Sequence, residues 1–476
     1  MLIGLGKPYG AASMTRTPFI KTAIAANVAF ACIAMPGLAS ASAIYDRIAA
    51  ANENTWIQLN LNSYSDAWVD ADDRPLRGLT NAPPSKLISA WSSFSWDSNR
   101  SDLLLYGGGH ANYTGNEVYR FSGTTLTWEN VSLPSEVVKV GNSNYLPVDG
   151  AQYAPQSAHT YDNSLFLKNA DRMMTFGGAA ADGGGGYRLL QSDGTVRATG
   201  PYLFDPNKAD GTKVGGSDGS NVQRVSGPAE GGYMWSNRDS DFAQGRSFIN
   251  GTTAVDSTGL YDVVYVTARS GGGTRSDLYR YTVVDPEDAS LDSWELVGVD
   301  WNGVSTKGTA GYDPERQLYV RTGNLSVQNF IYWDLSSTAS SNKNQRASFI
   351  APEDFEMNPN LGLDFDPVRN QFLIWGGSDV WALEIPDDLS QPWVITELFD
   401  GATGGPNATF LNGVLGKWHY AEDLDVFIAL ENAVDGNVWA YKPTGWQAVT
   451  AVPEPSTYAM LLAGLAIVGG TIRRRL

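Results

Sequence analysis

Cysteine and histidine are scarce in this sequence, whose 476 residues include one cysteine and three histidines. The cysteine, Cys32, lies in an N-terminal segment that we expect to be removed. Without it the protein can form no disulfide bond, thiolate metal site or cysteine nucleophile. No Asp-x-Asp-x-Asp-Gly calcium loop occurs, and no glycine loop opens a helix in the way that phosphate binding requires. The sequence therefore predicts no metal ion and no cofactor.

Basic residues are also fewer than acidic ones. The chain has 33 Lys and Arg against 51 Asp and Glu, which gives a formal net charge of −18. Such a chain repels nucleic acids and anionic membrane surfaces, so we expect no nucleic-acid partner. An acidic polysaccharide is a partner only if a local basic site overrides the negative field of the whole protein.

The first 43 residues have the pattern of a secretory signal peptide. Arg16 and Lys21 supply a positive start, residues 22–35 an apolar run, and the Ala-Ser-Ala triplet that ends at Ala43 a cleavage site. Signal peptidase is therefore a predicted partner, with cleavage after Ala43. The alternative is a membrane anchor, but the apolar run is shorter than the roughly 20 residues that a span needs.

The last 25 residues, 452–476, contain three features in a fixed order. Pro453-Glu454-Pro455 is followed by an apolar stretch at 458–472 and by three arginines at 473–475. Prolines end a preceding strand, the apolar stretch can enter a bilayer, and the arginines stay on its cytoplasmic side. The alternative interpretation is a permanent C-terminal anchor.

This order resembles the PEP-CTERM sorting signal, in which an exosortase is thought to cut at the Pro-Glu-Pro site. The resemblance implies that the protein is exported from a Gram-negative bacterium, that its tail enters the membrane transiently, and that it is delivered to the cell surface or the extracellular matrix.

Between the two ends one pattern recurs: an aspartate turn, an apolar strand, often a Gly-Gly pair, an aromatic strand and a strand with tryptophan. Two clear copies span residues 97–128 and 366–393, and four weaker ones span residues 172–205, 263–294, 313–334 and 426–446. Repeats of about 50 residues with these features are typical of β-propellers. Residues 86–451 resemble the kelch and galactose-oxidase central-domain propellers, which implies an all-β fold of six four-stranded blades.

Two segments leave the blade count and the ring closure open. Residues 206–250 are rich in Gly, Ser and Asp, so we expect an insertion there or else an atypical seventh blade. In the N-terminal segment 44–85, residues 56–60 have the pattern of an outermost strand that closes the ring. Residues 446–449 compete for the same place.

Candidate site residues come from one loop and from the inner strands. His110 follows three glycines in a polar loop, expected at the mouth of the channel, and His159 and His419 belong to segments expected to line that channel. Arg321 stands where other blades have Gly-Gly. The candidate catalytic residues are His110, Tyr113, His159 and Arg321, and the candidate ligand-binding residues are Asn112, Asn116, Tyr161, Trp418 and His419. The alternative is that these residues have structural roles: the loop is held by its own hydrogen bonds, the histidines are buried in the core, and Arg321 forms an ion pair.

Three functions are compatible with these features. The leading hypothesis is an exported propeller that binds a glycan or another extracellular partner through its loops, since aromatic residues stack on sugar faces. The second is a polysaccharide lyase or other glycan-active enzyme, with His, Tyr and Arg as base and uronate partner. The third is an architectural protein of the biofilm matrix. A copper-radical oxidase is excluded, because its cysteine–tyrosine cross-link has no cysteine here.

Overall fold

The computed structural model describes residues 43–75, 82–181, 183–216, 221–222, 227–270, 273–303, 307–322, 329–337, 341–358, 360–401, 404–406 and 412–449. Apart from Ala43, the predicted leader lies outside these residues, as does the whole predicted tail. Over the described ranges, no helix has both the length and the apolar character needed to cross a membrane. Helical structure there comprises α1 (Ala43–Ala49), α2 (Lys86–Ser89) and the 3-10 turns η1 (Tyr64–Ala67), η2 (Ala71–Asp73), η3 (Pro206–Lys208), η4 (Asp241–Ala243) and η5 (Ala289–Leu291).

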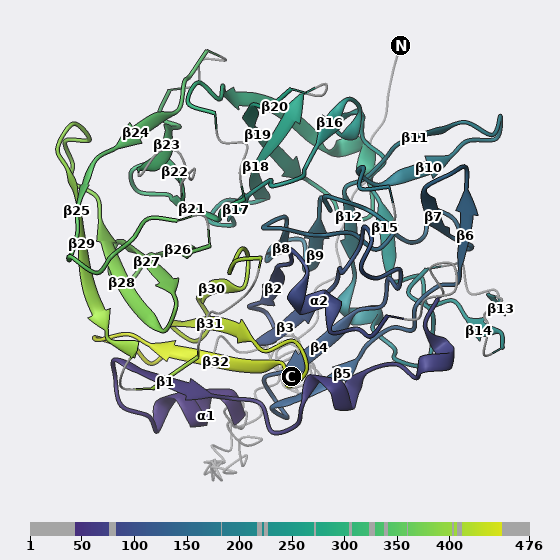
Figure 1. The fold of residues 1–476 in the computed structure, drawn as a ribbon, viewed down its shortest axis with the longest axis horizontal. Helices are drawn as coiled ribbons and strands as arrows, with labels where there is room; N and C mark the ends of the chain where they lie inside the picture. Colours follow the sequence, from purple (N-terminus) through teal and green to yellow (C-terminus); the bar gives the residue numbers. More distant parts are fainter. Residues whose placement is uncertain are drawn as a thin grey trace, which may run out of the picture. The chain divides into compact units, whose positions relative to one another are not determined.

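The described strands form six antiparallel blades around a common centre, so the predicted β-propeller is confirmed (Figure 1). Blade 1 is β2 (Phe94–Asp97), β3 (Asp102–Leu105), β4 (Tyr119–Ser122) and β5 (Thr127–Asn130); blade 2 is β8 (Ser164–Leu167), β9 (Arg172–Thr175), β12 (Tyr202–Phe204) and β15 (Trp235–Asn237). Blade 3 is β17 (Thr253–Asp256), β18 (Asp262–Ser270), β19 (Ser276–Val283) and β20 (Ser293–Gly298); blade 4 is β21 (Ala310–Asp313), β22 (Leu318–Arg321), β23 (Phe330–Asp334) and β24 (Gln345–Ala347). Blade 5 is β26 (Gly362–Asp366), β27 (Gln371–Gly376), β28 (Asp379–Glu384) and β29 (Trp393–Phe399); blade 6 is β30 (Trp418–Ala421), β31 (Val426–Glu431), β32 (Asn437–Lys442) and β1 (Thr55–Gln58).

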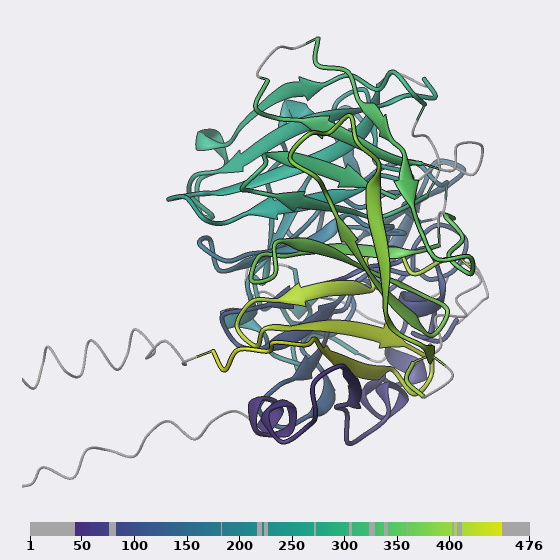
Figure 2. The same ribbon diagram turned by 90° about the vertical axis from the view of Figure 1, so that its left-hand side faces the viewer.

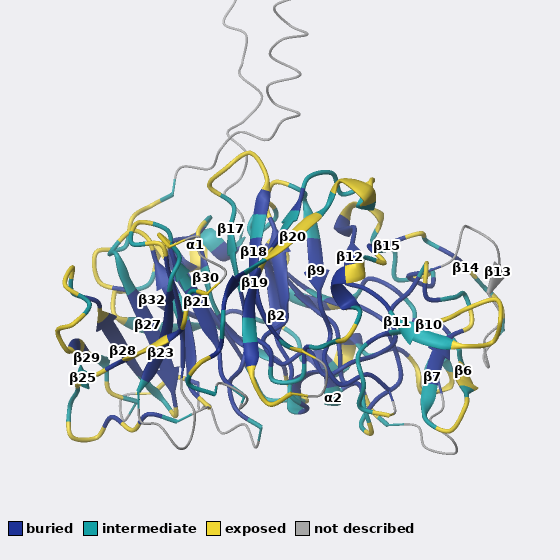
Figure 3. Cartoon of the chain, turned by 90° about the horizontal axis from the view of Figure 1, so that it is seen from above, coloured by how far each residue is buried: buried dark blue, intermediate teal, exposed yellow. Residues whose placement is uncertain are grey.

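The inner strands β2, β8, β17, β21, β26 and β30 surround the centre of Figure 1. The second strands of the blades are buried on both faces because blades pack against each other, as in β27, where five of six residues are buried. Such strands need continuous apolar runs rather than strict alternation. Figure 3 shows the result, with buried strands and exposure concentrated in the connections between them.

The N-terminal segment closes the ring. β1 pairs antiparallel with β32, with Trp56 opposite Tyr441, and so supplies the outermost strand of blade 6. Trp446, which competes for this place in the sequence, is outside any strand, and its indole N–H donates to the carbonyl of Leu424 at 2.8 Å.

The aspartate turns that mark the repeat also join neighbouring blades. Asp366 Oδ1 accepts the backbone N–H groups of Val368 and Arg369, each at 3.0 Å. The Arg369 guanidinium lies 2.9 Å from Asp366 Oδ2 and makes two hydrogen bonds of 2.9 and 2.8 Å to Asp425 of blade 6. The same arrangement links Arg100 with Asp97 and Asp171, and Arg316 with Asp313 and Asn370. The turn pattern therefore stabilises contacts between blades as well as the hairpins themselves.

Three hairpins extend beyond the blades: β6 (Val137–Val140) with β7 (Asn144–Pro147), β10 (Arg188–Leu190) with β11 (Val196–Ala198), and β13 (Asn221–Val222) with β14 (Ala229–Glu230). They lie beside one another in Figure 1. Residues 206–250 thus contribute one hairpin, the outermost strand of blade 2, and β16 (Arg246–Ser247), which pairs with β18. β25 (Phe349–Ile350) pairs parallel with β29. The described strands form six blades and no seventh.

We predict that Arg369→Ala lowers the free energy of unfolding by about 3 kcal/mol, because it leaves the buried Asp425 carboxylate without its cationic partner. Arg280→Ala is the matched control. Arg280 pairs with Glu295 on the neighbouring strand, but both side chains are about half exposed, so its removal changes stability by less than about 0.5 kcal/mol. Urea unfolding measures both; equal effects of the two substitutions would contradict the inter-blade role.

Candidate functional site

The two ends of the central channel are formed by different connections. The hairpins between first and second strands, at residues 98–101, 168–171, 257–261, 314–317, 367–370 and 422–425, share one face, which we call the hairpin face. The connections from second to third strands share the opposite face, the loop face, because neighbouring strands are antiparallel. Figure 2 shows the strands from the side, between these two sets of connections.

On the loop face, the glycine-rich loop of blade 1 touches the segment that leads into blade 2. A Cβ at Gly109 would lie 2.1 Å from Cα of Ala158, so this approach requires glycine. The loop thereby places the His110 ring 5.6 Å from the His159 ring, centroid to centroid and edge-on. Asn112 Nδ2 lies 2.8 Å from His159 Nε2. The structure therefore brings three of the candidate residues together.

Two aromatic side chains complete this group. The Trp91 ring lies 4.8 Å from that of His159, and the Tyr161 ring lies 6.0 Å from it. Trp91, His110 and Asn112 are partly exposed, whereas His159 and Tyr161 are buried beneath them. We refer to these five residues as the loop-face cluster.

His159 is held in its neutral form. An amide nitrogen can only donate, so Asn112 fixes His159 Nε2 as the acceptor and leaves the ring proton on Nδ1. Burial, and to a smaller extent the charge of His110, lower the pKa of His159 to about 3. Burial also raises the pKa of Tyr161 to about 12, against the opposing charge of Arg269. His159 and Tyr161 are therefore neutral hydrogen-bonding groups across the ordinary pH range.

Cationic side chains gather around the same end of the channel. Arg269 is the next-to-last residue of β18 and Arg321 the last of β22, while Lys307 and Lys417 precede the inner strands β21 and β30. All four positions are loop-face ends of strands. Burial and the charge of Lys307 lower the pKa of Lys417 to about 7, which shows that these two ammonium groups act on each other.

Arg321 is buried rather than exposed at the mouth. Its Nε donates to Thr252 Oγ1 at 3.2 Å and its Nη2 to the carbonyl of Asn250 at 3.1 Å. Burial lowers its pKa, while the charges of Asp300 and Asp162 act in the opposite direction. Arg321 therefore supplies positive charge below the loop face without reaching its surface.

Tyr113 and Asn116 support the loop from inside. The Tyr113 hydroxyl donates to Glu117 Oε1 at 2.6 Å, and Asn116 Nδ2 donates to the carbonyl of Pro155 at 3.0 Å. Asn116 Oδ1 also accepts the N–H of Ser135 at 2.8 Å. Both side chains are almost fully buried, so they fix the loop that carries His110 and do not face solvent.

Trp418 and His419 lie elsewhere. Trp418 is buried in the core, with its ring stacked 4.7 Å from that of Phe427 and its indole N–H donating to the carbonyl of Leu373. His419 lines a cavity of about 430 Å³ that opens among the hairpins of the hairpin face. The three histidines therefore do not form one group.

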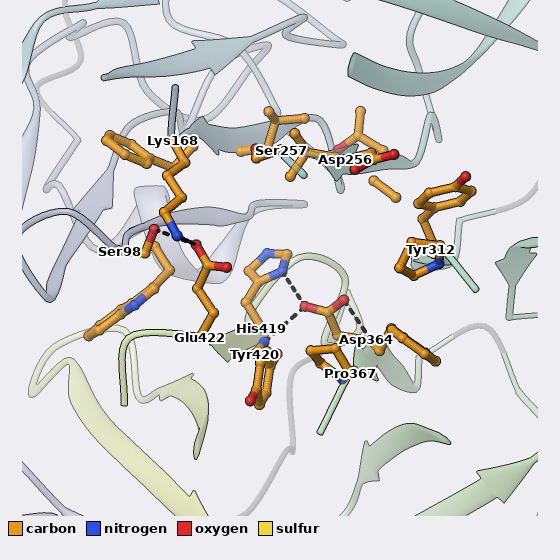
Figure 4. A pocket seen from close by; sticks show the side chains of 18 of the residues that line it. Ser98, Lys168, Asp256, Ser257, Tyr312, Asp364, Pro367, His419, Tyr420 and Glu422 are labelled. Carbon is orange, nitrogen blue, oxygen red and sulfur yellow. Dashed lines mark hydrogen bonds and ion pairs between the residues drawn. The ribbon is translucent and has the colours of Figure 1, made fainter. Parts of the chain in front are cut away.

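The His419 imidazole is paired with a carboxylate. Its Nδ1 lies 3.3 Å from Asp364 Oδ2, which also accepts the Tyr420 N–H at 2.9 Å (Figure 4). Burial would lower the pKa of His419, but the hydrogen bond and charge of Asp364 outweigh it, so the pKa is raised above its ordinary value.

Sequence reasoning did not identify Trp91, Arg269, Lys307, Lys417 or Asp364. Lys307 and Lys417 stand three residues and one residue before the first strands of their blades, so no common position in the repeat would have singled out this pair.

One further group of acidic residues could offer ligands to a metal ion. Asp379, Glu397 and Asp400 place carboxylate oxygens within 4.8 Å of one another in blade 5. Exposed acidic groups of this kind are common without an ion, so we assign no metal to it.

Residues 451–475 match the family model of the PEP-CTERM protein-sorting motif. The predicted sorting signal is confirmed: the chain is an exported protein, anchored in the membrane until exosortase-dependent processing. No curated protein sequence matches the chain.

Weak similarity to this chain is found among solved structures. The gluconolactonase XC5397 from Xanthomonas campestris is 10% identical over 81% of this chain and 99% of that chain, with a TM-score of 0.35. A chain of the mitotic checkpoint complex is 7% identical over 82% of this chain and 91% of its own, with a TM-score of 0.34. At this level of similarity neither structure bears on the activity of this chain.

We predict that the His419 ring titrates in NMR spectra with a midpoint above about 6.5, the ordinary value, and that Asp364→Asn moves the midpoint below it. Because the folded-state pKa is raised, the stabilisation from this pair is complete below about pH 6.5 and is lost as the pH rises through the folded-state value. A midpoint that Asp364→Asn leaves unchanged would show that Asp364 does not control the charge of His419.

Proposed function

We propose that this exported propeller, which carries the PEP-CTERM motif, binds an acidic glycan at the loop-face end of its channel. The supporting observation is that Arg269, Lys307, Arg321 and Lys417 gather beside the loop-face cluster in a chain with a net charge of −18. Like charges close together are unfavourable unless counter-charges compensate them. Asp162 and Asp300 act on Arg321, and a carboxylate-bearing ligand would supply further compensation.

The cluster has the other groups that a glycan site needs. The partly exposed ring of Trp91 can stack on the apolar face of a sugar. His110 and Asn112 are also partly exposed and can form hydrogen bonds with hydroxyl groups. The Arg269 guanidinium has the planar fork that pairs with a uronate carboxylate in two parallel hydrogen bonds. Uronate-containing polysaccharides therefore fit this end of the channel best.

Binding agrees better with the geometry than lyase chemistry does. A lyase base must reach the proton on the sugar carbon, but His159 is 1% exposed and its Nε2 already accepts from Asn112. Burial keeps Tyr161 protonated, with a pKa of about 12. These two side chains therefore favour orientation of a bound sugar over proton transfer.

The proposed place of action is the cell surface or matrix of a Gram-negative bacterium. The sorting motif implies processing by an exosortase, and acidic exopolysaccharide is a ligand available to a protein released there. A purely architectural role in the matrix would require no glycan site on the loop face.

We predict that the purified full-length protein binds oligouronates more tightly than neutral oligosaccharides of equal length in isothermal titration calorimetry. Arg269→Gln should weaken oligouronate binding by about tenfold, since a charge-assisted hydrogen bond contributes about 1.5 kcal/mol or more. Raising the salt concentration should weaken binding further.

Arg280→Gln is the control, because it removes an exposed arginine of the same blade that lies outside the loop-face cluster. Equal affinity for charged and neutral oligosaccharides would contradict the proposal. If the protein instead releases an unsaturated product, seen as rising ultraviolet absorbance, and His159→Ala abolishes this release, the function is lyase activity rather than binding. If the protein binds none of these oligosaccharides, the architectural role is favoured.

A further inference from the structure

The cavity on the hairpin face is distinct from the loop-face cluster. All six hairpins or their flanking residues line it, through Ser98, Lys168, Ser257, Pro314, Pro367 and Glu422 among others. Its volume of about 430 Å³ lies within the range of small-molecule sites in proteins. No residue of the loop-face cluster lines it, so the propeller has a second concave surface that the proposed glycan site does not use.

Aromatic and hydroxyl groups make up much of the cavity wall. Tyr312, Phe365 and Trp96 contribute ring surface, and Ser95, Ser98 and Ser257 belong to the same lining. This combination suits a ligand with one apolar face and several hydroxyl groups, since rings stack on the face and hydroxyls exchange hydrogen bonds. A single sugar ring has both features.

The charged groups of the wall divide into paired and unpaired ones. Lys168 is bound to Glu422 at 2.8 Å, and His419 to Asp364 at 3.3 Å, so the ammonium group and the imidazole of the lining each already have a carboxylate partner (Figure 4). That leaves one acidic side chain, Asp256, without a cationic partner among the described residues.

Asp256 keeps one oxygen available. Its Oδ1 accepts the backbone N–H of Thr258 at 3.0 Å and the Thr258 hydroxyl at 2.6 Å. Its Oδ2 has no hydrogen-bond partner among the described residues. Figure 4 shows Asp256 on the same side of the cavity as Tyr312, where a carboxylate and an aromatic ring together favour a positively charged group.

We propose that this cavity binds a small polyhydroxylated amine, with an amino sugar as the best fit. The ammonium group pairs with Asp256 Oδ2, the sugar ring lies against the aromatic wall, and the hydroxyl groups bond to the serine side chains. Asp256 repels the carboxylate of a uronate, so this cavity and the loop-face cluster select sugars of opposite charge.

Three probes of nearly equal size test the charge preference: glucosamine, N-acetylglucosamine and glucuronate, each titrated into the full-length protein. Glucosamine should bind at least about tenfold more tightly than N-acetylglucosamine, and glucuronate should bind most weakly, because only glucosamine carries a positive charge. Glucosamine should also shift the NMR signal of the His419 ring and leave those of His110 and His159 in place.

Asp256→Asn should weaken glucosamine binding about tenfold and leave N-acetylglucosamine binding unchanged. Asp193→Asn is a closely matched control: Asp193 Oδ1 accepts the N–H and hydroxyl of Thr195 at 2.9 and 2.6 Å, in the same local arrangement as Asp256 with Thr258, but does not line the cavity. Asparagine can still accept these bonds, so both variants should fold.

Equal binding of glucosamine and N-acetylglucosamine would overturn the proposal, as would glucosamine binding that Asp256→Asn leaves intact or Asp193→Asn weakens equally. A shift confined to His110 and His159 would place the amine at the loop face and overturn it as well. Arg269→Gln should not alter glucosamine binding, so failure of the loop-face proposal and failure of this one can be told apart.

Discussion

Asp162 connects the inner strands of several blades at the centre of the propeller. Its carbonyl accepts the Thr253 hydroxyl of blade 3 at 2.6 Å, and its Oδ2 accepts the Ala310 N–H of blade 4 at 3.0 Å. A Cβ at Gly416, just before blade 6, would lie 2.7 Å from Asp162 Oδ1. One residue of blade 2 thus contacts three other blades, and burial raises its pKa to about 8.

This connection lies between two regions of opposite charge. Above it, at the loop face, Lys307, Arg321 and Lys417 concentrate positive charge, and below it the cavity contains Asp256 and Asp364. The charges of Arg321, Lys417 and His419 all act on Asp162 or respond to it. Asp162 therefore lies close enough to the cations above and to the His419 imidazole below to interact with both.

The blades could be predicted from the sequence because their signals are local: an aspartate turn, a glycine pair and a tryptophan strand recur, in full or in part, along the chain. The contact of His110 with His159 could be anticipated only loosely, since it depends on how closely Gly109 approaches Ala158 in the next blade. His159 and His419 were both expected to line the channel, but whether they meet could not be predicted: His419 lies within β30, whereas His159 precedes β8, so the two occupy different heights in the channel. The strand pattern at 56–60 suggested ring closure, but the choice between it and 446–449, like the role of Asp162, rests on contacts between distant segments that no local pattern encodes.

The most direct test compares the free energies of unfolding of Asp162→Ala and Asp162→Asn. Asparagine can still accept the Ala310 N–H, whereas alanine leaves that buried N–H unpaired and opens space at the axis. We predict that Asp162→Ala is less stable than Asp162→Asn by about 2 kcal/mol. Two variants of equal stability, each within about 0.5 kcal/mol of the unmodified protein, would contradict the central role of this residue.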